Sequence, residues 1–162
     1  MDTSSIEGFS DYYITSEGEV VNEKTNRIMT LSPTLAGEPT VGLMHNGVQH
    51  RRSVKVLVAR AFVEGETEIF DTPIQLDGNR NNLHAENIVW RPRWFAWQYS
   101  AQFNQPQPDW YYAGPVLDMT YGLRYHTVLE AGITNGLLCR DILFSCNNQT
   151  PVFPTGQIFV FC

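Results

Sequence analysis

Oxygen-bearing side chains gather between residues 77 and 87 of the chain. Asp77 is followed there by four asparagines: Asn79, Asn81, Asn82 and Asn87. Such oxygens can hold a hard cation or hydrogen-bond the backbone of a tight turn. An EF-hand calcium loop starting at Asp77 would need glycine at its sixth position and glutamate at its twelfth. Asn82 and Ile88 stand at those positions, so the segment is predicted to be a hydrogen-bonded turn.

A second group of metal-binding residue types lies near the C-terminus. Cys139, Cys146 and His126 could be drawn as a metal site, but the chain has no Cys-x-x-Cys spacing. Buried thiols are the favoured interpretation. Three cysteines without paired spacing are typical of a reduced, intracellular setting. No metal and no other cofactor is therefore expected.

The elements before the asparagine-rich loop are predicted to be mainly β-strands. Apolar residues and turn signals place strands at 11–15, 20–22, 27–29, 40–44 and 49–51. Asn46-Gly47 between the last two predicts a tight hairpin. In residues 54–62 the apolar positions recur at helical spacing, and Ser53 can cap the first turn. A helix is therefore predicted there, although its valines alone would favour a strand.

The loop itself is predicted to lie between two short strands, 74–76 and 88–90, with a helix following from about Pro92. Residues 104–109 contain two prolines and are predicted to be a linker. Beyond it, the sequence predicts strands at 116–119, 124–126 and 157–161, and helices at 127–131 and 135–144. Gly132 is expected to end the first of these helices.

This arrangement resembles the HNH homing endonucleases of phages and introns. Their motif runs through Asp-Gly-Asn, then Asn-Asn, then Asn-Leu and a tryptophan. The chain carries, without a gap, Asp77-Gly78-Asn79, Asn81-Asn82 and Asn87-Ile88-Val89-Trp90. Residues 6–20 and the stretch 57–62 resemble the β-rich module that often precedes this motif. Residues 127–162 resemble, more weakly, the helix-turn-helix module that often follows it.

The resemblance implies an α+β fold in three parts. Residues 1–63 would form an N-terminal antiparallel β module ending in a helix, and residues 64–103 an HNH-like ββα core. Residues 110–162 would form a small helix-turn-helix/β module. The resemblance also implies a structural role for Asn87, which would hold the loop. The scaffold residues that it implies are Asp77, Gly78, Asn79, Asn82, Asn87 and Trp90.

The same resemblance implies that catalysis has been lost. The family's histidine base would stand at Gln75, and an amide cannot accept a proton near neutral pH. The family's metal carboxylate would stand at Ile74 and its second metal ligand at Ala96, and neither offers an oxygen to Mg²⁺. His84 could be proposed as a substitute base, although a variable loop histidine is the favoured interpretation. The chain is therefore predicted to be an HNH-like pseudoenzyme without catalytic residues.

The charge distribution bears on nucleic-acid binding. The 162-residue chain has a net charge of −6 and a pI of about 5.1, which disfavours a general nucleic-acid coat. Basic residues concentrate between 50 and 93, where seven of them face six acids. The candidate DNA-binding residues are Arg51, Arg52, Lys55, Arg80, Arg91 and Arg93. The alternative is a set of solvated charges that balance the acidic N-terminal sheet. The helix predicted near 135–142 offers one arginine, Arg140, which is weak for base recognition.

Aromatic side chains are abundant around the predicted linker and account for 12% of the chain. Tryptophan and tyrosine concentrate binding energy at protein interfaces. The candidate interface residues are Trp94, Trp97, Tyr99 and Trp110. The alternative is that all of them belong to the core.

Three functions compete, in this order. The first is a catalytically inactive protein that binds a protein partner or assembles with itself, as a structural component of a virion or a factor in host takeover. Low charge, scarce lysine and abundant aromatics favour it. The second is a double-stranded-DNA-binding protein that does not cut, and the third is an active nuclease with a rewired site. The chain shows no apolar run of transmembrane length and no signal peptide. It is therefore expected to be neither secreted nor in a membrane, and the family resemblance implies the host cytoplasm or the virion.

Overall fold

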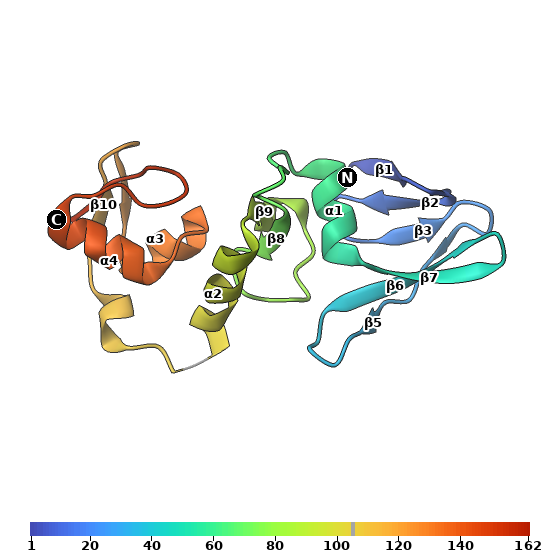
Figure 1. Cartoon of the computed structure of the whole chain (residues 1–162), viewed down its shortest axis with the longest axis horizontal. Coiled ribbons are helices and arrows are strands. Elements are labelled where there is room, and N and C mark those ends of the chain that lie inside the picture. The colour runs from blue at the N-terminus through green and yellow to red at the C-terminus, as the bar shows by residue number, and fades with distance from the viewer. Residues whose placement is uncertain (105) are drawn as a thin grey trace. The chain divides into compact units, whose positions relative to one another are not determined.

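The computed structural model describes residues 1–104 and 106–162, which form two compact units, Met1–Arg93 and Trp94–Cys162 (Figure 1). The predicted linker, residues 104–109, includes Gln105, which lies outside the described residues. Each unit has its own cluster of buried apolar side chains. Both units combine helices with small antiparallel sheets, so the predicted α+β class is confirmed.

The first unit begins with two antiparallel sheets. The four-stranded sheet has the order β1 (Thr3–Ile6), β2 (Phe9–Thr15), β3 (Val20–Asn22), β4 (Arg27–Ile28). The three-stranded sheet has the order β5 (Ser32–Pro33), β6 (Pro39–His45), β7 (Val48–Ser53). Asn46 and Gly47 have φ angles of 51° and 76°, as a two-residue hairpin turn requires, so the predicted hairpin is confirmed. The sequence did not predict β1 or β5, because both are short and mostly polar.

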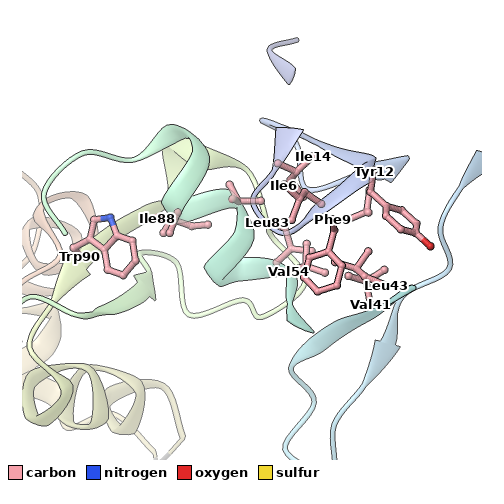
Figure 2. Close-up of a cluster of buried hydrophobic side chains, with 13 residues drawn as sticks. Ile6, Phe9, Tyr12, Ile14, Val41, Leu43, Val54, Leu83, Ile88 and Trp90 are labelled. Atoms are coloured by element: carbon pink, nitrogen blue, oxygen red, sulfur yellow. The ribbon is translucent and has the colours of Figure 1, made fainter. Parts of the chain in front are cut away.

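Helix α1 (Val54–Phe62) follows β7 directly, as predicted. The Ser53 hydroxyl caps it by accepting a hydrogen bond from the Val56 N–H at 3.4 Å. The buried helix residues Val54, Val58 and Ala59 join a core with side chains of β1, β2 and β6, shown in Figure 2. This burial on one face outweighs the preference of valine for strands.

Two short strands frame the asparagine-rich loop. Strand β8 (Thr72–Gln75) pairs antiparallel with β9 (Ile88–Arg91), and a 3-10 turn, η1 (Ala85–Asn87), leads into β9. The Trp90 indole N–H donates to the Val63 carbonyl at 2.9 Å, and Leu83 is buried in the same core (Figure 2). Both ends of the loop are therefore fixed to the core of the first unit.

The second unit contains helices around a small sheet. Its elements are α2 (Arg93–Asn104, from Trp94 onward), η2 (Asp109–Tyr112), β10 (Val116–Asp118), β11 (Leu123–Tyr125), α3 (Val128–Asn135), α4 (Cys139–Asn148) and β12 (Phe159–Phe161). The sheet has the order β11-β10-β12. Its core lies between this sheet and α3 and α4, and includes Leu137, Ile142 and Phe159. The helix predicted from about Pro92 is confirmed, with its start at Arg93.

The predicted boundaries of α3 and α4 were wrong. Helix α3 continues through Gly132 and ends at Asn135, and Gly136, with a φ of 65°, is its left-handed cap. Gly132 serves close packing instead, because a Cβ there would lie 3.0 Å from the Cys139 sulfur and 3.1 Å from the Leu137 carbonyl oxygen. Helix α4 consequently starts at Cys139, four positions beyond the predicted start. Within the described residues, no helix has both the length and the apolar character needed to span a membrane.

Candidate functional site

The asparagine-rich loop is held by its own side chains. Asn87 joins the two ends: its Oδ1 accepts from the Asp77 N–H at 3.2 Å, and its Nδ2 donates to Asp77 Oδ1 at 2.9 Å and to the Asn82 carbonyl at 3.1 Å. In the middle of the loop, Asn79 Oδ1 accepts from the Asn81 N–H at 3.0 Å. The structure therefore brings the predicted loop residues together as a hydrogen-bonded turn.

Asp77 is the charged centre of this network. Its carboxylate accepts from the Asn79 N–H at 2.9 Å and from the amides of Asn82 at 2.8 Å and Asn87 at 2.9 Å. Burial raises the pKa of Asp77, but these hydrogen bonds outweigh it, and the pKa lies below its ordinary value. Both carboxylate oxygens are thus engaged in holding the turn as an ionised group.

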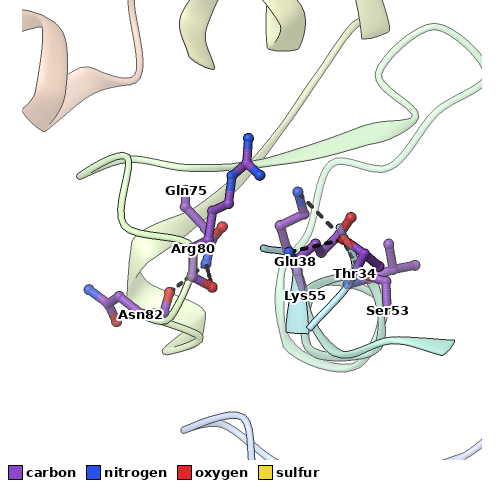
Figure 3. Close-up of polar contacts among 8 residues, drawn as sticks. Thr34, Glu38, Ser53, Lys55, Gln75, Arg80 and Asn82 are labelled. Carbon is purple, nitrogen blue, oxygen red and sulfur yellow. Dashed lines mark hydrogen bonds and ion pairs between the residues drawn. The ribbon is translucent and has the colours of Figure 1, made fainter. Parts of the chain in front are cut away.

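Gln75 occupies the position at which the resemblance places a base. It is 8% exposed, and its Nε2 donates to the backbone carbonyls of Arg80 at 3.0 Å and Asn82 at 2.9 Å (Figure 3). Both amide hydrogens are therefore used to hold the loop. The side chain cannot take a proton from water, and it stabilises the turn instead.

The positions at which the resemblance places the metal ligands carry apolar side chains. Ile74 is buried in β8 and Ala96 is buried on α2, in the second unit, and neither side chain carries a donor atom. Across residues 1–104 and 106–162, no three His, Cys, Asp or Glu side chains are grouped so that they could hold a metal. His84 is exposed, and no carboxylate of the described chain hydrogen-bonds its ring to orient it as a base.

Three of the predicted DNA-binding residues have other surroundings. Lys55 lies 3.7 Å from the Glu38 carboxylate, which also accepts from the Ser53 hydroxyl at 2.6 Å (Figure 3). Arg91 is buried and its Nη1 donates to the Trp90 carbonyl at 2.9 Å, which disfavours its predicted contact with DNA. Arg93 is exposed but lies 3.8 Å from Asp71, which offsets part of its charge.

Arg51, Arg52 and Arg80 remain as exposed cations. The guanidinium of Arg52 lies 5.3 Å from the Phe9 ring centroid, while Arg51 donates to the Thr40 hydroxyl at 3.4 Å. No carboxylate of the described residues forms an ion pair with any of the three. Both Arg51 and Arg52 are exposed on β7. The β6–β7 hairpin of the three-stranded sheet therefore carries two positive charges without an acidic partner among the described residues.

The four candidate interface aromatics divide into two kinds. Trp97 and Trp94 are 78% and 53% exposed, and Trp110 is half-buried with its ring centroid 4.5 Å from that of Tyr111. Tyr99 is 1% exposed and stacks on Phe95. Tyr99 is therefore a core residue, and its prediction as an interface residue was wrong.

The cysteines are thiols in different surroundings. Cys139 is buried, as predicted, and burial raises its pKa to about 12. Burial also raises the pKa of the half-buried Cys146 to about 11. His126 is exposed. Both thiols therefore stay protonated at neutral pH.

Sequence reasoning missed Gln98 and Gln102, which contact the start of α4. Gln102 Oε1 accepts from the Cys139 N–H at 2.7 Å, and Gln98 Oε1 accepts from Arg140. The sequence shows that Gln98 and Gln102 are four residues apart and so share one face of a helix. This spacing does not show that their partners lie about forty residues further along the chain.

Comparison with known proteins gives a fold. No protein-family model and no curated protein matches the chain. A solved structure described as "DNA binding and cleavage by the HNH homing endonuclease I-HmuI" matches over 100% of this chain and 98% of that chain, with a TM-score of 0.59 and 20% sequence identity. The chain therefore has the fold of an HNH homing endonuclease.

Proposed function

We propose that the protein binds double-stranded DNA and does not cleave it. The observation that carries this proposal is the site at Gln75, where the loop is intact but the base position is an amide committed to two backbone carbonyls. A nuclease of this type needs a proton acceptor and a Lewis acid at the scissile phosphate. Ile74, Gln75 and Ala96 supply neither, so the scaffold persists without the groups that make the nucleophile.

The similarity to a DNA-binding endonuclease supports DNA as the partner. It covers all of the chain, including elements far from the asparagine-rich loop, and the matched protein is described as binding DNA. A protein that keeps this fold but lacks the catalytic groups is suited to bind DNA without cleaving it.

The β6–β7 hairpin is the candidate DNA contact. A two-stranded β-ribbon fits the major groove of B-DNA. Alternation along β7 places Arg52 and His50 on the face that meets the Phe9 ring, and Gln49 and Arg51 on the opposite face. We assign base or phosphate contact to Gln49 and Arg51, with Arg52 at the edge of the same ribbon. DNA binding is thus placed before protein binding, the reverse of the order inferred from the sequence, because the fold similarity covers the whole chain.

The experiment combines binding and cleavage in one titration. The full chain is incubated with labelled duplex DNA and Mg²⁺ or Mn²⁺ at several salt concentrations, and native and denaturing gels are run together. We expect a shift that weakens steeply with salt and no cleaved product. Replacing Arg51 and Arg52 together by alanine should lower the slope of log K against log salt by about 1 per lost phosphate contact.

Arg60→Ala is the matched control, since Arg60 is exposed but already lies 3.3 Å from Glu66. It should leave the shift unchanged. A cleaved strand that accumulates with protein concentration would show that the site is catalytic after all. A missing shift at low salt would remove DNA as the partner.

Protein binding is the second candidate function. The exposed Trp94 and Trp97 on α2 favour it, because exposed tryptophans are costly to leave in water and are concentrated at interfaces. This candidate includes the self-assembling or virion-associated role expected from composition.

A further inference from the structure

A groove in the second unit combines aromatic walls with hydrogen-bond donors. It lies between α2, η2 and the start of α4, and its volume is about 280 Å³. All its lining residues belong to the unit Trp94–Cys162, so the groove does not depend on the first unit. Its base is apolar and includes the buried Leu138.

Three aromatic rings form the walls. Trp97 is 78% exposed, and Trp110 packs edge-on against Tyr111, with ring centroids 4.5 Å apart at an angle of 65°. A tryptophan so exposed leaves most of its ring without an apolar partner in the chain. The rings therefore offer flat apolar surface to a ligand that lies along the groove.

The polar atoms of the groove are almost all donors. Gln102 Oε1 accepts from the Cys139 N–H, and Gln98 Oε1 accepts from the Arg140 guanidinium. With its oxygen engaged, each glutamine presents its NH₂ group, which has no acceptor among the described residues. The two indole N–H groups are donors as well, and so is Arg140, whose Nε lies 3.7 Å from the Asp141 carboxylate. Burial raises the pKa of Tyr111, so its hydroxyl stays protonated, and no carboxylate lines the groove.

We propose that this groove binds a proline-rich segment of a partner protein in the polyproline II conformation. Proline has no N–H, so such a segment presents carbonyl acceptors and no competing backbone donors at its prolines. The donors of the groove are complementary to its carbonyl oxygens, and the aromatic rings are complementary to the proline rings. Duplex DNA would need several cations, and Arg140 is the one that lines the groove.

The test uses the full chain and a blocked hexaproline peptide, with a blocked glycine-serine hexamer as the control peptide. Binding is measured by titration calorimetry. We expect saturable binding of hexaproline only, and Trp97→Ala should weaken it about tenfold or more, as loss of an aromatic anchor does. Phe144→Ala is the matched control, because Phe144 is an exposed aromatic residue on α4 of the same unit but does not line the groove. It should bind like the unmodified chain.

A second pair of variants tests the donors without removing the local contacts. Gln98→Glu and Gln102→Glu keep the oxygens that accept from Arg140 and Cys139 but remove the NH₂ donors. Each should weaken hexaproline binding several-fold while the melting temperature changes little.

Three results would overturn the proposal. The first is absence of saturable hexaproline binding, or equal binding by Trp97→Ala. The second is Trp97-dependent binding of a thymidine hexanucleotide in place of hexaproline, which would make the groove a site for unpaired bases. The third is a Trp97-dependent dimer in sedimentation that hexaproline does not disrupt, which would assign the groove to a second copy. Loss of duplex binding in the gel experiment would affect none of these outcomes.

Discussion

Gln75 illustrates how a side chain can hold a loop from a position suited to catalysis. It donates to two backbone carbonyls in a site that is 8% exposed. Gln75→Glu would place a carboxylate against those carbonyl oxygens and raise its pKa in the folded state. The variant should therefore be tolerated at low pH and lose stability as the pH rises from about 4.3, the ordinary glutamate value, through the raised value of the folded state. We expect a loss of about 1–3 kcal/mol in the free energy of unfolding at pH 7, measured by urea denaturation.

Gln49→Glu is the matched control for Gln75→Glu, because it makes the same change of charge at an exposed position of β7. Its stability should show little pH dependence. If Gln75→Glu unfolds at the same urea concentration as the unmodified chain at pH 7, the two hydrogen bonds from Gln75 do not hold the loop.

Asp77 gives the opposite pH dependence. Its pKa is lowered in the folded state, so its contribution to stability is present above the unfolded value of about 3.9 and is lost as the pH falls through the folded value. Asp77→Asn should cost about 1–2 kcal/mol of the free energy of unfolding at pH 7, and this cost should shrink toward pH 2. Urea denaturation across this pH range measures it. Asp109→Asn is the control, and a cost for Asp77→Asn that stays constant with pH would contradict the assigned role.

At the scale of the element, α3 and α4 depend on a close approach at Gly132. Alanine normally stabilises a helix by about 1 kcal/mol over glycine. Here a Cβ would lie 3.1 Å from the Leu137 carbonyl oxygen. Leu137 cannot easily move away, because its N–H donates a hydrogen bond to the Gly132 carbonyl. Gly132→Ala should therefore destabilise the second unit by about 1–3 kcal/mol, seen as a lower melting temperature. Thr134→Ala, an exposed site on the same helix, should be neutral or slightly stabilising. A stabilising Gly132→Ala would show that α3 and α4 can separate at no cost.

Local and long-range contacts explain which elements the sequence predicts. The β6–β7 hairpin and α1 follow from short patterns, Asn46-Gly47 and the Ser53 cap, and both are confirmed. In the sequence, Gly132 looks like a glycine that ends a helix. Only its close approach to Cys139 in the folded chain shows that it is a packing residue inside α3. The position of Gln75 could be foreseen, but its partners could not, since they are backbone carbonyls of the folded loop. Burial of Arg91 and pairing of Lys55 with Glu38 likewise depend on segments that no periodicity connects.

At the scale of the whole molecule, each unit has its own core. Leu43 is fully buried in the first and Leu137 in the second. A leucine-to-alanine change at a fully buried site costs about 2–5 kcal/mol. We expect Leu43→Ala to lower the melting temperature of the first unit alone, and Leu137→Ala that of the second alone, by about 4–8 °C per kcal/mol. The indole N–H signals in NMR spectra recorded against temperature separate the two, because Trp90 lies in the first unit and Trp94, Trp97 and Trp110 lie in the second.

The same pair of variants assigns the two proposed activities to the two units. At a temperature where Leu137→Ala has unfolded the second unit, the shift of duplex DNA through the β6–β7 hairpin should persist and hexaproline binding should be lost. Leu43→Ala should give the reverse pattern above its own transition. If all four indole signals move together in either variant, the chain unfolds as one cooperative body, and the two activities cannot be separated in this way. Independent transitions would mean that the DNA contact of the first unit and the groove of the second unit can be occupied separately.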